Sequence, residues 1–233
     1  MIFSTSKTEL QKALQKLSKA SPLRSTLPSL SCFLIKTKDE KAVLKATDLE
    51  ITIETTIPTS IEEPGVTSLP IKTLLDITNE LPETRITFSI NGNNNVKITT
   101  DLGEYNIMAK PADEFPNTPK IQNSDKIVIE GKILKEIIDA SSFAVSRDEL
   151  KPALTGVLFK ISPDGVTAVS TDGHRLVKYK RNDYVTNSTI KDIIIPKKFL
   201  SYLSNHISKS DVSLHFEENH MAARIKDDII STR

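Results

Sequence analysis

The residues with the greatest chemical potential stand together in one string, Thr171-Asp172-Gly173-His174-Arg175-Leu176. A carboxylate, an imidazole and a guanidinium so close together could form a catalytic or a binding cluster. A catalytic histidine also needs an orienting partner and a nucleophile, and the sequence has no Gly-x-Ser-x-Gly element to supply one. A tight turn with Asp172 and Gly173 as its turn residues would explain the same string. We therefore favour a binding surface over a catalytic site.

A second string, Asp48-Leu49-Glu50-Ile51-Thr52, follows an apolar run that ends near Ala46. It resembles the aspartate signature of the haloacid dehalogenase phosphatases. That family has a second aspartate where this chain has Glu50, and it requires alternating strands and helices. Alternation along an antiparallel strand, with Glu50, Thr52 and Glu54 facing solvent, explains the string without catalysis. We favour this second interpretation.

The sequence offers little for a metal or a cofactor. Cys32 is the only cysteine, and the four histidines lack the spacing of metal ligands. Seven glycines form no phosphate-binding loop. The flanks of Cys32 are typical of a strand, which predicts a buried thiol, and a single cysteine suggests a reducing, cytoplasmic location. No apolar run approaches the roughly 20 residues that a membrane span requires. We expect no cofactor and no membrane partner.

The two strings occupy equivalent places in an internal repeat with an offset of 124 residues. Thr47-Asp48 aligns with Thr171-Asp172, and the offset also aligns Leu10 with Leu134 and Pro28 with Pro152. A period of this length is typical of a duplicated domain. Copy one has Leu-Glu-Ile where copy two has Gly-His-Arg. The shared Thr-Asp is therefore predicted to be architectural, and the residues after it are predicted to be functional in copy two.

Hydrophobic periodicity predicts two helices and about eight strands in each copy, an α+β fold with helices packed on antiparallel sheets. The helices are expected at 5–19, 70–81, 132–144 and 196–207. A hairpin is expected over 86–90 and 96–100, with an Asn-Gly turn at 91–92. A linker rich in Pro, Asp and Asn covers 110–125, so we expect one domain over 1–120 and another over 121–233.

The end of the second copy differs from the end of the first. By the repeat, residues 229–233 lie near the last strand of copy one, at 105–109. We therefore expect copy two to end in or next to its final strand and the chain to be a fragment of a longer protein.

Positive charge is gathered on the helices although the net charge is only +1. Every predicted helix carries at least one lysine, and ordinary solvated faces would explain any single one of them. If all helices line one surface, that surface is basic and can bind phosphate groups without reading base sequence. The basic residues concerned are Lys12, Lys16, Lys19, Arg24, Lys72, Lys132, Lys135, Lys197 and Lys198.

Along its whole length the chain resembles the bacterial sliding clamps, the beta subunits of DNA polymerase III. In copy one the matching strings are Arg24 with Thr26-Leu27-Pro28, Thr47-Asp48-Leu49-Glu50, Leu69-Pro70 and Ala112-Asp113-Glu114-Phe115-Pro116. In copy two they are Pro152-Ala153-Leu154-Thr155-Gly156-Val157, Thr171 to Leu176, and Ile195-Pro196-Lys197-Lys198. The string from Thr171 to Leu176, with Leu-Thr-Gly upstream, is specific to that family.

The resemblance implies a non-enzymatic processivity factor. Clamp subunits carry three similar domains, and two subunits close head-to-tail into a ring that encircles duplex DNA and slides along it. A pocket on the second domain, completed by the third, receives short motifs from the polymerase III alpha subunit, the clamp loader and other proteins. The resemblance places DNA contacts at Arg24, Lys72, Lys197 and Lys198. It places the peptide site at Leu154, Thr171, Gly173, His174, Arg175 and Leu176.

Two departures from the family accompany this resemblance. The chain has two domains where the family has three, so the third domain is expected to be missing, and with it ring closure and part of the pocket. Lys151 stands where arginine is common, which keeps the charge but loses bidentate geometry. Two other functions remain open at this stage: a phosphotransferase that uses Asp48 or the pair Asp172 and His174, and a peptide-binding module without DNA contact.

Overall fold

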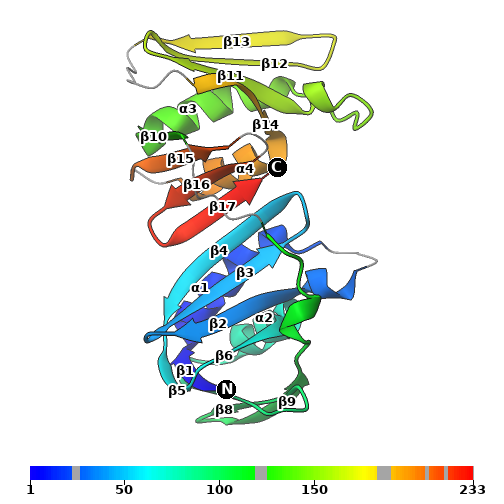
Figure 1. The fold of residues 1–233 in the computed structure, drawn as a ribbon, viewed down its shortest axis with the longest axis vertical. Coiled ribbons are helices and arrows are strands. Elements are labelled where there is room, and N and C mark those ends of the chain that lie inside the picture. The colour runs from blue at the N-terminus through cyan, green and yellow to red at the C-terminus, as the bar shows by residue number, and fades with distance from the viewer. Residues whose placement is uncertain (23–26, 119–124, 183–189, 208–209, 218–219, 233) are drawn as a thin grey trace. The chain divides into compact units, whose positions relative to one another are not determined.

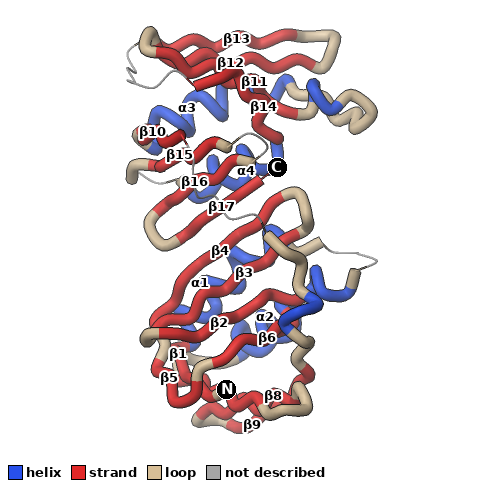
Figure 2. Tube along the Cα trace, in the orientation of Figure 1, coloured by secondary structure: helices blue, strands red, loops and turns tan. Residues whose placement is uncertain are grey.

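The chain divides into two units, which consist mainly of Met1–Thr118 and Pro119–Lys226. The fold comes from a computed structural model that describes residues 1–22, 27–118, 125–182, 190–207, 210–217 and 220–232 (Figure 1). The side chains of residues 190 and 191 are not described. More of each unit is strand than helix (Figure 2).

The N-terminal unit is built from two helices and nine strands among its described residues. Its helices are α1 (Lys7–Leu17) and α2 (Ile71–Glu80). Its strands are β1 (Ile2–Ser6), β2 (Cys32–Lys38), β3 (Lys41–Thr47), β4 (Ile51–Pro58), β5 (Ser60–Glu63), β6 (Gly65–Pro70), β7 (Arg85–Ile90), β8 (Asn95–Thr100) and β9 (Gly103–Met108).

Two antiparallel sheets hold this unit together. One has the strand order β5-β1-β7-β8-β9, and β4, β3, β2 and β6 are neighbours in the other. α1 packs against α2 and against β3 and β4. The helix α1 buries Leu10, Ala13, Leu14 and Leu17, which recur at helical spacing and form one apolar stripe. Phe3 and Phe88 stack 4.8 Å apart in the core of the first sheet.

The C-terminal unit repeats the plan. Its helices are α3 (Gly131–Ser141) and α4 (Lys197–His206). Its strands are β10 (Asp125–Ile129), β11 (Gly156–Ser162), β12 (Gly165–Thr171), β13 (Leu176–Arg181), β14 (Ile190–Pro196), β15 (Val212–Phe216) and β16 (Met221–Ile225), and β17 (Asp228–Thr232) is the last described strand. One sheet has the order β13-β12-β11-β14, and β10, β15 and β16 are antiparallel neighbours in another. α3 packs on α4, β12 and β13.

This architecture confirms the α+β class with two helices and antiparallel sheets in each copy. The buried position of Cys32, 2% exposed, was also expected, and burial raises the pKa of its thiol. The strands β5 and β6 were not predicted, because the region between Pro58 and Pro70 is short, polar and interrupted by proline and glycine. Within the described parts of the chain, no helix is long and apolar enough to span a membrane.

The expected hairpin of β7 and β8 is confirmed. Its turn is centred on Gly92 and Asn93 rather than on Asn91 and Gly92, because the Asn94 N–H donates to the main-chain oxygen of Asn91. The Asn91 side chain organises this loop. Asn91 Oδ1 accepts hydrogen bonds from the main-chain N–H groups of Asn93 and Asn95. Asn94 takes the left-handed conformation, with φ of 59°, which asparagine tolerates better than most residues.

Candidate functional site

The string from Thr171 to Leu176 forms the turn between β12 and β13. Thr171 Oγ1 donates a hydrogen bond to the main-chain oxygen of Arg175 at 2.6 Å and accepts one from the Gly173 N–H at 3.1 Å. Asp172 Oδ1 accepts from the N–H groups of His174 and Arg175, each at 3.0 Å. These two bonds are the main reason why the pKa of Asp172 lies below its ordinary value. Gly173 has φ of 91°, where glycine is favoured.

The turn after β3 in the N-terminal unit has the same construction. Thr47 Oγ1 donates to the main-chain oxygen of Ile51 at 2.9 Å and accepts from the Leu49 N–H at 3.1 Å. Asp48 Oδ1 accepts from the N–H groups of Glu50 and Ile51. This confirms that the shared Thr-Asp pair is architectural. Since Asp48 Oδ1 organises the turn, the structure gives no support to a catalytic nucleophile there.

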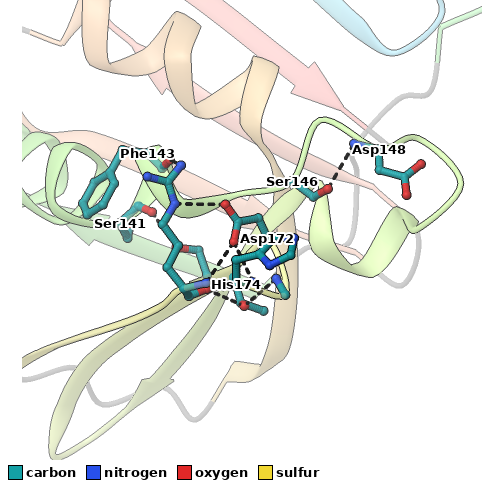
Figure 3. Close-up of polar contacts among 10 residues, drawn as sticks. Ser141, Phe143, Ser146, Asp148, Asp172 and His174 are labelled. Atoms are coloured by element: carbon teal, nitrogen blue, oxygen red, sulfur yellow. Dashed lines mark hydrogen bonds and ion pairs between the residues drawn. The ribbon is translucent and has the colours of Figure 1, made fainter.

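The two turns differ in what their side chains do beyond the turn itself. Arg175 Nε donates to Asp172 Oδ2 at 2.9 Å, and one of its terminal nitrogens, Nη2, donates to the main-chain oxygen of Phe143 at 2.9 Å. The guanidinium carbon lies 5.7 Å from the centre of the Phe143 ring, within range of a cation–π contact. Figure 3 shows Asp172 between the Arg175 side chain and the main chain of the turn, with dashed lines for its hydrogen bonds.

All six residues of the expected peptide site lie at one end of the four-stranded sheet. In the pairing of β11 with β12, Leu158 lies opposite Val169. If this register continues, the start of β11 lies beside Thr171. Thr171 in turn pairs with Leu176 at the start of β13. Leu154 precedes β11 in a short 3₁₀ helix, Pro152–Leu154, and its main-chain oxygen accepts from the Ser146 N–H at 2.8 Å.

This end of the sheet presents apolar side chains to solvent. Leu176 is 67% exposed and Phe143 is 54% exposed. Leu154 is half-buried, and His174 and Arg175 are exposed. Large exposed apolar side chains that gather with an aromatic ring and an arginine are typical of protein-binding surfaces.

The lysines expected to contact DNA lie in the first turns of helices. Lys72 is the second residue of α2, and Lys197 and Lys198 are the first two residues of α4. Lys132 is the second residue of α3. No acidic residue lies in the first turn of these three helices, and no side chain caps them. Helix N-termini attract anions and disfavour cations. Lysines at these positions are therefore unfavourable for the helices themselves, but they add to the attraction that the helix N-termini have for phosphate groups.

Other lysines are committed to contacts inside their own unit. Lys12 pairs with Glu9 one turn earlier in α1. Lys135 Nζ lies 3.3 Å from Asp139 and donates to the main-chain oxygen of Ser204 at 3.1 Å, which links α3 to α4. These two lysines agree with the ordinary solvated helix faces that the sequence left open for any single lysine. Arg24, the remaining expected DNA contact, lies outside the described residues.

Two family models match the chain. A model described as DNA polymerase III beta subunit, N-terminal domain, covers residues 1–119, and one described as the central domain covers residues 128–233. The chain belongs to the DNA polymerase III beta subunit family. The recognition made from the sequence motifs is thereby confirmed.

Several members of this beta subunit family are similar to the chain. Beta sliding clamps of Staphylococcus epidermidis and Staphylococcus aureus are 34% and 32% identical to it, over 89% of this chain and 57% of the relative. A DNA polymerase III beta subunit structure from Eubacterium rectale is 30% identical, with a TM-score of 0.94 over all of this chain and 64% of that one. A sliding clamp from Bacillus subtilis is 28% identical, also with a TM-score of 0.94. The chain thus spans little more than half the length of these curated relatives.

Two contacts of Arg175 were not predicted from the sequence. Asp172 was assigned to the turn but not to an ion pair with Arg175, and Phe143 was not singled out at all. Phe143 stands 32 residues before Arg175 in the sequence, at the end of an ordinary apolar helical pattern. No local signal marks it, although an aromatic residue just after a helix and left exposed could have raised the question.

Proposed function

We propose that the chain is part of a sliding clamp, a non-catalytic ring that holds a replicative polymerase on duplex DNA. The observation that carries this proposal is family membership over both domains, together with a fold similar to solved clamps over the whole chain. The fold supplies what such a ring needs. Lysines stand at helix N-termini for contact with phosphates, and an apolar turn surface is available for partner proteins.

The DNA contacts in this proposal are Arg24, Lys72, Lys197 and Lys198. Lys72 and Lys198 are exposed at their helix N-termini, and Lys197 is half-buried. Lysine contacts the phosphate backbone as a point charge and reads no base. Contacts of this kind exchange readily as the duplex moves, so they permit sliding where base-specific contacts would stop it. Retention then comes from the closed ring rather than from high affinity.

The partner site in this proposal consists of Leu154, Thr171, Gly173, His174, Arg175 and Leu176. Its occupants are short segments of the polymerase III alpha subunit, the clamp loader and other proteins with clamp-binding motifs. A sliding clamp of Bartonella birtlesii, 25% identical to this chain, was solved bound to griselimycin. We extend that binding to this protein, with the apolar side chains of Leu154 and Leu176 as its contacts.

The proposed assembly is a head-to-tail ring in the cytoplasm. The strand β9 supports it, because β9 stands at the edge of its sheet and pairs with β8 alone among the described strands. Its side chain Met108 is 61% exposed, and Leu102 just before it is 65% exposed. An edge strand with exposed apolar side chains is well suited to a subunit interface.

Retention on circular DNA tests this function directly. The complete gene product is loaded by its clamp loader onto nicked circular DNA, and the protein that stays bound is counted after gel filtration. A sliding ring remains on the circle and is lost when a restriction enzyme makes the DNA linear, because the ring slides off the ends. Equal retention on circular and linear DNA would show ordinary binding and refute the clamp. Absence of retention on both forms would also count against it.

A further inference from the structure

The Arg175 side chain is held in place although its surroundings are open. Its side chain is 56% exposed, yet it makes an ion pair with Asp172, a hydrogen bond to the main-chain oxygen of Phe143 and a contact with the Phe143 ring. A long exposed side chain normally samples many rotamers. Three contacts that act on one planar group remove that freedom before any ligand arrives.

The fold does not need these contacts to form the turn. The N-terminal unit builds the same turn with Ile51 at the position of Arg175, and its hydrogen bonds to Thr47 and Asp48 match those of the second copy. At an offset of 124, Lys19 stands where the second copy has Phe143. The duplicated domain is thus an internal control, and the fixed arginine is an addition specific to copy two.

We propose that Asp172 and Phe143 are positioning residues, which hold Arg175 as a pre-oriented hydrogen-bond donor for neutral oxygen atoms of the bound partner peptide. This inference rests on the proposed peptide site. A guanidinium has five N–H groups, and the contacts with Asp172 and Phe143 use two of them. The remaining three make no hydrogen bond within the described part of the chain, and a ligand can accept from them.

The expected acceptor is a main-chain carbonyl or a side-chain amide oxygen rather than a carboxylate. Asp172 Oδ2 lies 2.9 Å from Arg175 Nε, so its negative charge already balances the guanidinium. An acidic ligand side chain would approach that carboxylate as well as the arginine, and the two negative charges would repel each other. A carbonyl oxygen accepts the same hydrogen bonds without that repulsion, and its binding depends little on salt.

The Phe143 ring adds an apolar surface beside this donor. The guanidinium covers part of the ring, and the side chain as a whole remains 54% exposed. A peptide that hydrogen-bonds Arg175 through its main chain can therefore place an apolar side chain against the ring. Phe143 in this way contributes to specificity as well as to the position of Arg175.

Fluorescence anisotropy tests the proposal with a labelled peptide that carries the clamp-binding motif of a polymerase III alpha subunit. The complete protein is compared with Arg175→Ile, which introduces the residue of copy one, and with Asp172→Asn and Phe143→Leu. We expect Arg175→Ile to weaken binding about tenfold and the other two variants about three- to tenfold, which is the effect of losing an oriented charged donor. Circular dichroism should show the same fold for all of them.

A double-mutant comparison separates positioning from structural damage. If Asp172 acts through Arg175, Asp172→Asn has no further effect on binding in the Arg175→Ile background. An equal additional loss in that background would overturn the positioning role. The affinity of the unmodified protein should change less than about twofold between roughly 50 and 500 mM salt. A steep loss with salt would refute the neutral acceptor and indicate a carboxylate.

Leu176→Asp distinguishes failure of this inference from failure of the proposed site. If Leu176→Asp abolishes binding while Arg175→Ile leaves it unchanged, the peptide site stands and the role of Arg175 is refuted. If Leu176→Asp also binds normally, the proposed peptide site itself is wrong, and the inference falls with it.

Discussion

At the scale of single residues, the left-handed position of the duplicated turn is occupied by two different amino acids. Gly173 has φ of 91° in the C-terminal unit, and Leu49 has φ of 77° at the equivalent place in the N-terminal unit. For a residue with a side chain this conformation costs about 1–2 kcal/mol. Leu49 is 47% exposed, so burial compensates only in part for that cost.

We expect Leu49→Gly to stabilise the N-terminal unit by roughly 0.5–1 kcal/mol, because relief of the strain exceeds the extra freedom of glycine in the unfolded chain. Gly173→Leu should destabilise the C-terminal unit by about 1–2 kcal/mol for the converse reason. Urea denaturation followed by circular dichroism measures both. A loss of stability in Leu49→Gly would mean that the packing of the leucine outweighs its strain.

At the scale of elements, the four helices begin in different ways. In α1 the Ser6 side chain accepts a hydrogen bond from the Glu9 N–H, and Glu83 accepts one from the Thr8 N–H. All four helices have a lysine in the first turn, Lys7 in α1 included, but α2, α3 and α4 have neither an acidic residue nor a side-chain cap there. A local rule broken in three helices of one fold is typical of a functional surface.

Lys72→Glu should therefore raise stability while it lowers DNA retention. A carboxylate near the N-terminus of α2 interacts favourably with the helix dipole, and we expect a gain of roughly 0.5–1 kcal/mol. The same change places a negative charge where a phosphate would bind. Urea denaturation and retention on circular DNA measure the two effects. Reduced stability would show that Lys72 makes a stabilising contact, and unchanged retention would remove it from the DNA surface.

At the scale of the whole molecule, the low net charge has to be reconciled with the proposed binding of DNA. The net charge of +1 cannot by itself attract DNA, so any attraction must come from the placement of individual lysines. Some of them, such as Lys135, are bound to neighbouring side chains. For Lys72 and Lys197, no carboxylate lies within ion-pair distance in the part of the chain that the structure describes.

The salt dependence of DNA binding tests this division. Each phosphate contact contributes about 0.9 to the slope of log K against log salt concentration. The double variant Lys72→Ala with Lys197→Ala should therefore lower the magnitude of that slope by roughly 1–2. Lys135→Ala is the matched control. It removes one positive charge from a helix but should leave the slope unchanged, since Lys135 is engaged with Asp139 and Ser204. Equal effects of both changes would contradict the assignment.

Much of the fold follows from local pattern. The offset of 124 residues, the apolar stripe of α1 and the strand alternation together predict two α+β copies. The pair Asp172-Gly173 predicts the turn. These features can be predicted because helices, strands and turns have periods and residue preferences that extend over only a few positions. The hairpin of β7 and β8 was predicted, but the centre of its turn at Gly92 and Asn93 was not, since that depends on how the Asn91 side chain accepts hydrogen bonds from the Asn93 and Asn95 N–H groups. The strands β5 and β6 escaped it too, because their stability comes from pairing with distant β1 and β2.

The sequence by itself determined that the chain is a duplicated clamp fold and that its two Thr-Asp turns diverge after their shared frame. Only the tertiary structure decided which charged side chains contact other residues of the chain and which remain available to a ligand. Lys135 and Ser204 meet because α3 packs on α4, and Arg175 meets Phe143 because the end of α3 lies against β12. The physical reason is the same in both cases. Side-chain hydrogen bonds act over about 3 Å, and only the folded chain brings residues so distant in sequence within that reach.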